Sequence, residues 1–326
     1  MAPRRGIVQA MDKATYDVAV IGGGAAGLSA ALVLGRARRR VAVIDGGSPR
    51  NAPAAHMHGF LSRDGMPPSE LLKIGREEAT AYDVEFIADH VVSVEPGFEV
   101  GLAGGEILVA RRLLISTGAT DEFPAIPGLK ERWGRDFLHC PYCHGWEVRD
   151  QALGILGTSS GSVEHAQLIR QWSDDLIFFA HTYAVTGAER EQLEARGISI
   201  VDGDVRDLVV EGGRLRGVML GDGRIVERDA LFVRPEIRPR ATNLLEHLGC
   251  GVDDHGFLVV DEVGRTSVPG IWAAGNVANP RAQVITAAGE GSAAAISINA
   301  DLIQQDVQRA SDEAHQTSPM TAQKES

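Results

Sequence analysis

Hydrophobic positions in the N-terminal part of the chain form short continuous runs, and glycines bound the first of them. The run 16–21 (YDVAVI) is apolar and β-branched, and the segment 22–27 (GGGAAG) follows it directly. Residues 28–39 have the composition of a helix, and residues 41–45 (VAVID) form a second apolar run. Continuous apolar runs are typical of strands that are buried on both faces of a parallel sheet. The pattern predicts a βαβ unit of about 30 residues near the start of the chain.

A second pattern of strand, glycine-rich turn and helix begins at Leu153. The segments LGILG, TSSGS and VEHAQLIRQW are followed by an apolar strand at 176–180. Other strand-like runs lie at 85–94, 112–117, 198–205, 213–220 and 230–235. We expect the last three to form a meander that closes the second domain. The chain therefore carries two openings typical of nucleotide-binding domains.

The C-terminal region combines a strand, a polar loop and a long helix of small residues over 271–298. Small side chains allow a helix to pack closely on a sheet or on a cofactor. From about Gln304 onward the chain is polar and has no apolar face, which predicts a solvated or disordered tail.

Charge and length narrow the class of protein. The chain has 326 residues, and its 32 Lys and Arg against 44 Asp and Glu give a net charge of −12. This length suggests two domains, and the acidic balance argues against nucleic acid or an anionic membrane as the main partner. No apolar run reaches the ~18 residues of a membrane span, and the first fifteen residues lack the apolar core of a secretory signal. We expect a cytoplasmic protein.

The first glycine motif has the spacing of a dinucleotide-binding turn. Gly22, Gly24 and Gly27 follow a strand and precede a helix, whose N-terminus offers free N–H groups to phosphates. Asp45 ends the second strand, where its carboxylate can accept hydrogen bonds from ribose hydroxyls. The alternative is a glycine-rich turn that serves only the packing of the strand on the helix.

The three cysteines favour redox chemistry over a disulfide scaffold or a metal site. Cys140 and Cys143 are separated by two residues in the sequence HCPYCHGWE, and Cys250 stands alone. A zinc site would want a second pair, so we expect no metal. His144 can move protons at neutral pH, as thiol–disulfide exchange requires. The alternatives are two buried cysteines that pack as small hydrophobic residues and, for Cys250, a structural position, which we favour.

These motifs resemble the low-molecular-weight thioredoxin reductase family of flavoproteins, from about Tyr16 to Ile303. The resemblance rests on GGGAAG with Asp45, on STGA at 116–119, on the Cys pair, and on AAGNV and RAQVITAAGEG near the C-terminus. It implies an α/β fold with two Rossmann-like nucleotide-binding domains. The FAD domain would be discontinuous, formed by residues 1–123 and 240–326, with a smaller, NADPH-domain-like insertion at 124–239 that carries the Cys pair.

The resemblance also implies FAD as the cofactor and a homodimer as the assembly. The positions that match the FAD-binding residues of the family are Gly22, Gly24, Ala25, Ala26, Gly27, Asp45, Asn51, Val91, Gly118, Gly275, Asn276, Gln283 and Val284. Two milder departures are Asn276, where an Asp is usual, and Ala282, where an Arg is usual. Neither removes the FAD assignment, because an amide can still bond a ribityl hydroxyl.

Three departures bear on function. His144 stands where the family usually has Asp, and Gly157, Ser159 and Ser162 replace the GxGxxA fingerprint of the NADPH site. The segment 181–183 (HTY) replaces the His-Arg-Arg cluster that holds the 2′-phosphate. The loss of two arginines removes charge-assisted hydrogen bonds, so we expect the NADPH site to be defective.

A Cys-x-x-Cys-His motif without an NADPH site resembles the dithiol oxidases that close disulfides in gliotoxin, holomycin and romidepsin. The resemblance implies an FAD-dependent oxidase that acts on a small natural-product dithiol, with molecular oxygen as the electron acceptor. Cys140 would exchange with substrate sulfur, Cys143 would face the flavin, and His144 would act as the base.

Two other functions stay open on the sequence alone. One is a disulfide reductase fed by NADPH through an altered site, or by ferredoxin. The other is a flavin-binding protein without turnover. In the loop 50–68, exposure of His56 and His58 is a more common outcome than an approach to the flavin, and the role of His139 is open.

Overall fold

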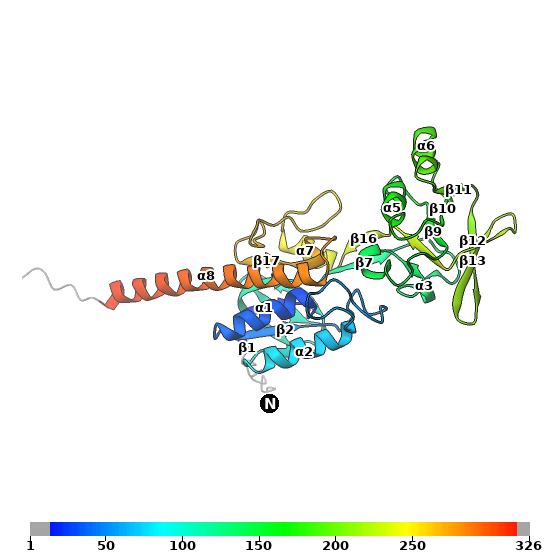
Figure 1. Cartoon of the computed structure of the whole chain (residues 1–326). Coiled ribbons are helices and arrows are strands. Elements are labelled where there is room, and N and C mark those ends of the chain that lie inside the picture. Colours follow the sequence, from blue (N-terminus) through cyan, green and yellow to red (C-terminus); the bar gives the residue numbers. More distant parts are fainter. Residues whose placement is uncertain (1–13, 318–326) are drawn as a thin grey trace, which may run out of the picture. The chain divides into compact units, whose positions relative to one another are not determined.

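The computed structural model describes residues 14–317, which form an α/β fold of two compact units (Figure 1). Unit 1 contains the described residues up to Gly47, then Leu72–Gly118, and the chain from Pro239 onward. Unit 2 contains Ser48–Leu71 and Ala119–Arg238. The main sheet of each unit contains a set of parallel strands of the Rossmann type, as the sequence predicts. The segment Ser48–Leu71 lies within the stretch 1–123 that we assigned to the FAD domain, but it groups with unit 2.

The sheet of unit 1 has the strand order β3-β2-β1-β6-β5-β4, and β17 pairs with β6. The pairs β1–β2, β1–β6, β2–β3 and β6–β17 are parallel, whereas β4–β5 and β5–β6 are antiparallel. The strands span β1 Ala14–Ile21, β2 Val41–Ile44, β3 Glu85–Ile87, β4 Val91–Glu95, β5 Glu99–Leu102, β6 Ile107–Ile115 and β17 Ile271–Ala273.

Both faces of β1 are buried, which explains the continuous apolar run. Val18 and Val20 belong to one hydrophobic cluster, and Ala19 and Ile21 belong to another. Successive side chains of a strand point to opposite faces, so a strand covered on both sides has no polar position to alternate with.

The helices of this part of the chain are α1 Ala25–Arg36, α2 Pro68–Thr80, α7 Thr242–Leu248, the short 3₁₀ helix η1 Gly275–Val277, and α8 Val284–Thr317. Helix α1 starts three residues before the predicted position, because the extended backbone of Gly24 forms its N-cap. Helix α8 packs closely on α1: a Cβ atom on Gly291 would lie 2.0 Å from the carbonyl oxygen of Ala26. The small residues predicted for α8 therefore serve contact between helices.

The expectation of a disordered tail from Gln304 is wrong for the described residues. Helix α8 continues to Thr317, and Figure 1 shows it running on past α1. Asp306 on this stretch forms ion pairs with Arg39 and Arg111. The side chains described along this last stretch are mostly exposed, so the helix is solvated as expected although it is ordered. Residues 318–326 and 1–13 lie outside the described part.

Unit 2 has a five-stranded sheet in the order β11-β10-β9-β15-β8, with all pairs parallel. Its strands are β8 Phe137–Leu138, β9 Leu153–Leu156, β10 Leu176–Phe179, β11 Ser199–Val201 and β15 Ala230–Val233, and its helices are α3 Leu129–Arg132, α4 Pro141–His144, α5 Gly161–Ile169 and α6 Gly187–Ala195. An antiparallel sheet is formed by β12 Val205–Glu211, β13 Arg214–Leu220 and β14 Ile225–Glu227.

The predicted closing meander is only partly correct. The run 198–205 contains β11 and the start of β12, and β11 and β15 both join the parallel sheet. The run at 230–235 is apolar because its strand β15 is buried between β9 and β8 in the sheet. A two-stranded ladder of β7 Ala119–Glu122 and β16 Glu236–Pro239 completes the fold. Within residues 14–317, no helix is both long enough and apolar enough to span a membrane.

Candidate active site

In the first glycine turn, close backbone packing leaves no room for a side chain at Gly22 and Gly27, whereas the space beside Gly24 is open. A Cβ atom on Gly22, whose φ is +110°, would lie 2.3 Å from the carbonyl oxygen of Ser116. A Cβ atom on Gly27 would lie 2.0 Å from the carbonyl oxygen of Gly22. By contrast, a Cβ atom on Gly24 would meet nothing within 4 Å. Gly24 therefore leaves the backbone accessible to a ligand at the N-terminus of α1, where the first N–H groups have no partner in the helix.

Asp45 lies beside this turn. Its Oδ1 accepts a hydrogen bond from the Gly47 N–H at 3.2 Å, and its Oδ2 is paired with Arg76. A Cβ atom on Gly23 would lie 2.7 Å from the Asp45 carboxylate. The structure thus brings the acidic residue and the glycine turn together, as pyrophosphate and ribose recognition requires. Ala25 and Ala26 form the first turn of α1.

The remaining residues matched to FAD binding lie in several segments. Val91 begins β4, and the ring of its neighbour His90 lies against Gly46, next to Asp45. Gly118 has a φ of +75° and open space at its Cβ position. Asn51 lies in unit 2.

The other matched residues lie between the start of η1 and the first residue of α8. The Gly275 N–H donates to Glu290, and Asn276 donates through Nδ2 to the carbonyl oxygens of Asn279 and Ala282. This leaves Asn276 Oδ1 as the atom that can accept from a ligand hydroxyl. Gln283 immediately precedes α8, and Val284 is its first residue.

The two cysteines of the HCPYCH motif form a disulfide at a helix start. Cys140 is the N-cap of α4, Pro141 is its first residue, and the Cα atoms of Cys140 and Cys143 are 5.2 Å apart. The backbone N–H groups of Cys143 and His144 both donate to the carbonyl oxygen of Cys140. Cys250 is buried in the core of unit 1, and burial raises the pKa of its thiol, which keeps it in the unreactive protonated form.

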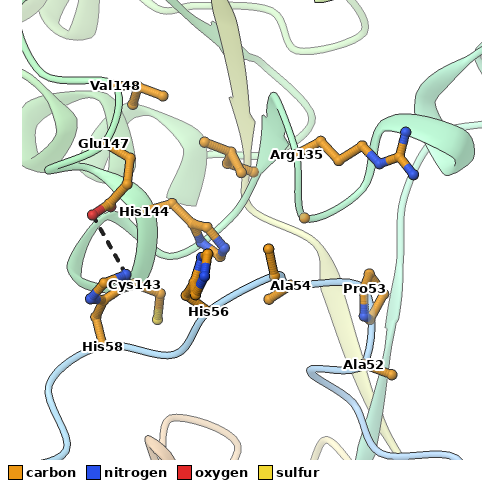
Figure 2. A pocket seen from close by; sticks show the side chains of 13 residues that line it. Ala52, Pro53, Ala54, His56, His58, Arg135, Cys143, His144, Glu147 and Val148 are labelled. Carbon is orange, nitrogen blue, oxygen red and sulfur yellow. Dashed lines mark ion pairs between the residues drawn. The ribbon is translucent and has the colours of Figure 1, made fainter. Parts of the chain in front are cut away.

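A pocket of about 460 Å³ lies within unit 2 beside the disulfide (Figure 2). One sulfur, three imidazoles and two charged groups line it together with small and apolar residues. The full set of lining residues is Ala52, Pro53, Ala54, Ala55, His56, His58, Gly134, Arg135, Leu138, Cys143, His144, Glu147 and Val148. The residues come from the segment Ser48–Leu71 and from the region around α4. Segments far apart in the sequence therefore line one pocket.

His144 lines this pocket as a partly buried side chain whose two ring nitrogens are both buried. Neither of its ring nitrogens has a hydrogen-bond partner among the described residues, and burial lowers the pKa of His144 below its usual value. The nearby Glu147 carboxylate opposes this effect on the pKa. The ring is therefore neutral at pH 7 and able to accept a proton.

The expectation of exposed loop positions for His56 and His58 is incomplete, because both residues line the pocket. His56 is nevertheless largely exposed, whereas His58 is partly buried. His58 Nε2 lies 3.5 Å from Glu147 Oε1, the contact drawn in Figure 2. Glu147 was missed in the sequence, although it follows His144 by three residues on the same motif. The contact with His58 is long-range and left no local signal.

His139 is held by contacts with the backbone and with a second histidine, away from the pocket. Its Nδ1 lies 3.1 Å from the Val233 carbonyl oxygen, and its own carbonyl oxygen is 2.9 Å from His165 Nε2. Burial lowers the pKa of both rings, that of His165 to about 4. Neither ring lines the pocket of Cys143.

The second glycine turn, between β9 and α5, is closed by its own side chain. Ser162 is fully buried, and its Oγ accepts hydrogen bonds from the N–H groups of Thr158 at 3.1 Å and of Ser159 at 3.3 Å. These are amides that a phosphate-binding turn would offer to its ligand. The Ser162 side chain therefore competes with a pyrophosphate for the same donors.

The segment that replaces the 2′-phosphate cluster is also tied internally. His181 Nδ1 accepts a hydrogen bond from the Val205 N–H at 3.1 Å, and the Tyr183 hydroxyl donates to Glu189 at 2.7 Å. Glu189 in turn completes the capping box of α6 with Thr186. None of the three side chains of the segment 181–183 (HTY) carries a fixed positive charge.

Comparison with known proteins assigns the family. Residues 16–291 match the model of the pyridine nucleotide-disulphide oxidoreductase family, so the chain belongs to this family. The crystal structure of HlmI is 53% identical, with a TM-score of 0.91 over 93% of this chain and 97% of HlmI. An oxidoreductase from Agrobacterium tumefaciens is 35% identical, with a TM-score of 0.84 over 89% of this chain and 99% of its own. Thioredoxin reductase sirT from Leptosphaeria maculans is 30% identical over 87% of this chain and 93% of sirT.

The family, the fold and the motifs agree on the class of enzyme. The protein is a thioredoxin reductase-like flavoprotein, an FAD-dependent thiol/disulfide oxidoreductase. The open backbone at Gly24 with Asp45 beside it fits the pyrophosphate and a ribose of FAD.

Proposed function

We propose that the protein is a dithiol oxidase that forms an intramolecular disulfide in a small natural-product dithiol, with molecular oxygen as the final electron acceptor. The observation that carries this proposal is the closed second glycine turn, in which Ser162 binds the amides that NADPH would need. Electrons that do not enter from NADPH can enter from a dithiol at the Cys140–Cys143 disulfide. The resemblance of the Cys-x-x-Cys-His motif to dithiol oxidases points in the same direction.

The exchange proceeds in two balanced steps. A substrate thiolate attacks Cys140 Sγ, a substrate–Cys140 disulfide forms, and the electron pair of the broken bond stays on Cys143. The second substrate thiolate then attacks the substrate sulfur of that mixed disulfide, which closes the substrate disulfide and releases Cys140 as a thiolate. FAD held at the glycine turn and Asp45 would supply the acceptor for the electron pair of the enzyme dithiol, so that the Cys140–Cys143 disulfide re-forms; oxygen would take up that pair with the two thiol protons and leave as hydrogen peroxide.

His144 takes the proton that each attack requires. Thiols with a pKa near 8.5 are mostly protonated at neutral pH, and only the thiolate attacks a disulfide. The His144 ring is neutral because it is buried, and it lines the same pocket as Cys143. The small residues Ala52, Ala54 and Ala55 leave room for a compact substrate beside these groups.

The FAD-binding roles of the residues matched above and a homodimeric assembly form part of the same proposal. Helix α8 exposes Ile296, Ile303 and Val307, which share one face because they are spaced at i, i+7 and i+11. An exposed apolar stripe of this kind suits contact with a second copy of the chain.

An anaerobic titration of the holoenzyme tests the direction of electron flow. Dithiothreitol, as a model dithiol, should bleach the flavin absorbance through the Cys pair, whereas NADPH should bleach it slowly or not at all. Cys140→Ser and Cys143→Ser should retain FAD but lose reduction by the dithiol. Rapid bleaching by micromolar NADPH would favour the reductase suggested by the names of the relatives. Loss of FAD from both cysteine variants would indicate a structural disulfide.

A further inference from the structure

The segment 140–145, called the redox turn below, is tied to the sheet and to α5 at its N-terminal end. His139 precedes Cys140, and its Nδ1 lies 3.1 Å from the carbonyl oxygen of Val233 on β15. The carbonyl oxygen of His139 accepts a hydrogen bond from Nε2 of His165 on α5 at 2.9 Å. Since a carbonyl oxygen can only accept, Nε2 of His165 carries the proton. The residue before the disulfide is therefore held through both its side chain and its backbone.

His165 makes this contact from inside the core of unit 2. The side chain is buried, and its ring lies against those of His139 and Phe232, with ring centroids 5.6 Å and 6.3 Å away. Burial lowers the pKa of His165 to about 4, so the ring is neutral at pH 7. Its Nδ1 has no hydrogen-bond partner among the described residues. The polar contact of this buried ring is therefore directed at the backbone of the residue next to Cys140.

Trp172, three residues after the end of α5, holds the other end of the redox turn. Its indole lies against Gly145, the C-cap of α4: a Cβ atom on Gly145 would be 2.7 Å from Trp172 Nε1. The same ring makes an edge contact with Tyr142, which stands between the two cysteines, at 5.6 Å between centroids. The carbonyl oxygen of Trp172 accepts from the Asp150 N–H at 2.8 Å. One stretch of chain, 161–172, therefore contacts both ends of the redox turn.

These contacts do not involve sulfur, so they can persist when the disulfide is reduced. The Cα atoms of Cys140 and Cys143 are 5.2 Å apart, a separation that suits a disulfide. A dithiol whose backbone is already held at this separation loses less conformational freedom when the bond closes. Fixing the two ends of the redox turn therefore favours the disulfide over the dithiol.

We propose that His165 and Trp172 are positioning residues, which keep Cys140 and Cys143 at bonding distance in the dithiol and so favour re-formation of the disulfide. The assignment rests on the redox role of the Cys pair in the proposed function. Neither residue lines the pocket of Cys143, so both act through the backbone of the redox turn. Ser162, one turn before His165 on α5, occupies the amides of the second glycine turn, which suits a helix used as a support.

The equilibrium between the disulfide and the dithiol measures this effect. FAD-loaded enzyme is equilibrated without oxygen in buffers of reduced and oxidised glutathione, in which two glutathione thiols reduce the Cys140–Cys143 disulfide and become one glutathione disulfide. The mixture is quenched with acid, denatured and alkylated, and the free thiols are counted by mass. Cys250, a free cysteine, is the internal reference.

Removal of the His165 donor should shift this equilibrium toward the dithiol. We expect His165→Leu to lower the ratio of disulfide to dithiol about three- to tenfold, as loss of one hydrogen bond allows. A tenfold fall corresponds to a rise of about 30 mV in reduction potential. His165→Gln, whose amide nitrogen can donate to the same carbonyl oxygen, should restore most of the ratio. Trp172→Leu should shift the ratio in the same direction, and it carries the test if His165→Leu loses FAD.

The matched control is Gln167→Leu. Gln167 also lies on α5, but its Nε2 donates to the carbonyl oxygen of Gln192 on α6 at 3.3 Å, away from the redox turn. Its replacement should leave the ratio unchanged. Thermal unfolding is recorded for the oxidised and the reduced forms of each variant. A side chain that only stabilises the fold would lower the stability of both forms equally and leave the ratio in place.

Three outcomes would overturn the assignment: a ratio unchanged in both His165→Leu and Trp172→Leu, a shift as large in Gln167→Leu, or a shift that His165→Gln leaves in full. The equilibrium involves neither a natural-product dithiol nor oxygen. Its result is therefore independent of whether the enzyme is an oxidase, and the two proposals can fail separately.

Discussion

Ser162 accepts the backbone N–H of Thr158 on its Oγ at 3.1 Å, inside the turn where a second dinucleotide would place its phosphates. The donor is satisfied by the chain itself, and the side chain that satisfies it is fully buried. The family fold is thus retained in unit 2, while two amide donors of this turn already have a partner in Ser162.

NADP⁺ should therefore bind poorly to the oxidised enzyme. Each charge-assisted hydrogen bond contributes ~1.5–3 kcal/mol, and two arginines are missing at 182–183, so affinity should fall by about 10²–10⁴-fold relative to an intact site. Isothermal titration should give no saturable heat with micromolar NADP⁺. A micromolar dissociation constant would show that the turn opens to accept the nucleotide.

Gly24 and Gly27 should respond differently to replacement by alanine. Gly24→Ala places a methyl group where the structure shows open space, so the fold should persist while FAD affinity drops. Gly27→Ala forces a methyl group against the carbonyl oxygen of Gly22, so stability and FAD content should both fall. Thermal unfolding of the apoprotein, together with flavin content, separates the two effects. Equal destabilisation of the apoprotein by both substitutions would contradict the assignment of Gly24 to ligand binding.

Replacement of His144 should slow dithiol oxidation and change its pH dependence. His144→Ala should cost about 10²–10⁴-fold in rate, the usual share of a general base, with normal flavin content. Because burial lowers the pKa of His144, the wild-type rate should persist below pH 6.5 and fall only as pH drops through the lowered pKa. The variant should recover part of its rate at high pH as substrate thiols ionise. A variant with an unchanged pH–rate profile per bound FAD would exclude the base role.

His165 should make the protein sensitive to acid. Its pKa is lowered to about 4 in the fold, against ~6.5 in the unfolded chain, so between these values the unfolded state binds more protons. The stability that comes from keeping this ring neutral is complete above pH 6.5, and about 3 kcal/mol of it should be lost by pH 4. His165→Gln should flatten this dependence in urea unfolding measured at several pH values. A wild-type slope that survives the substitution would assign it to other groups.

Local patterns were sufficient to predict the βαβ unit, the glycine turn and the redox-type Cys pair. These features depend on neighbours a few residues apart, and their patterns are written into short stretches of sequence. The continuation of α8 to Thr317 was not predictable from local sequence. On this stretch Asp306 forms ion pairs with Arg39 and Arg111, which lie far away in the chain and leave no local pattern. The contact of His58 with Glu147 was missed for the same reason, since it joins segments far apart in the chain.

The most direct test of electron flow from a dithiol to oxygen is the stoichiometry of the aerobic reaction without any nicotinamide. Oxygen uptake, hydrogen peroxide and disulfide product are measured together for the FAD-loaded enzyme with an excess of a model dithiol, against the Cys140→Ser variant. We expect one oxygen consumed and one peroxide formed for each disulfide, and no turnover in the variant. If the dithiol-reduced enzyme stays reduced in air until NADP⁺ or a disulfide substrate is added, oxygen is not the acceptor and the oxidase assignment is wrong.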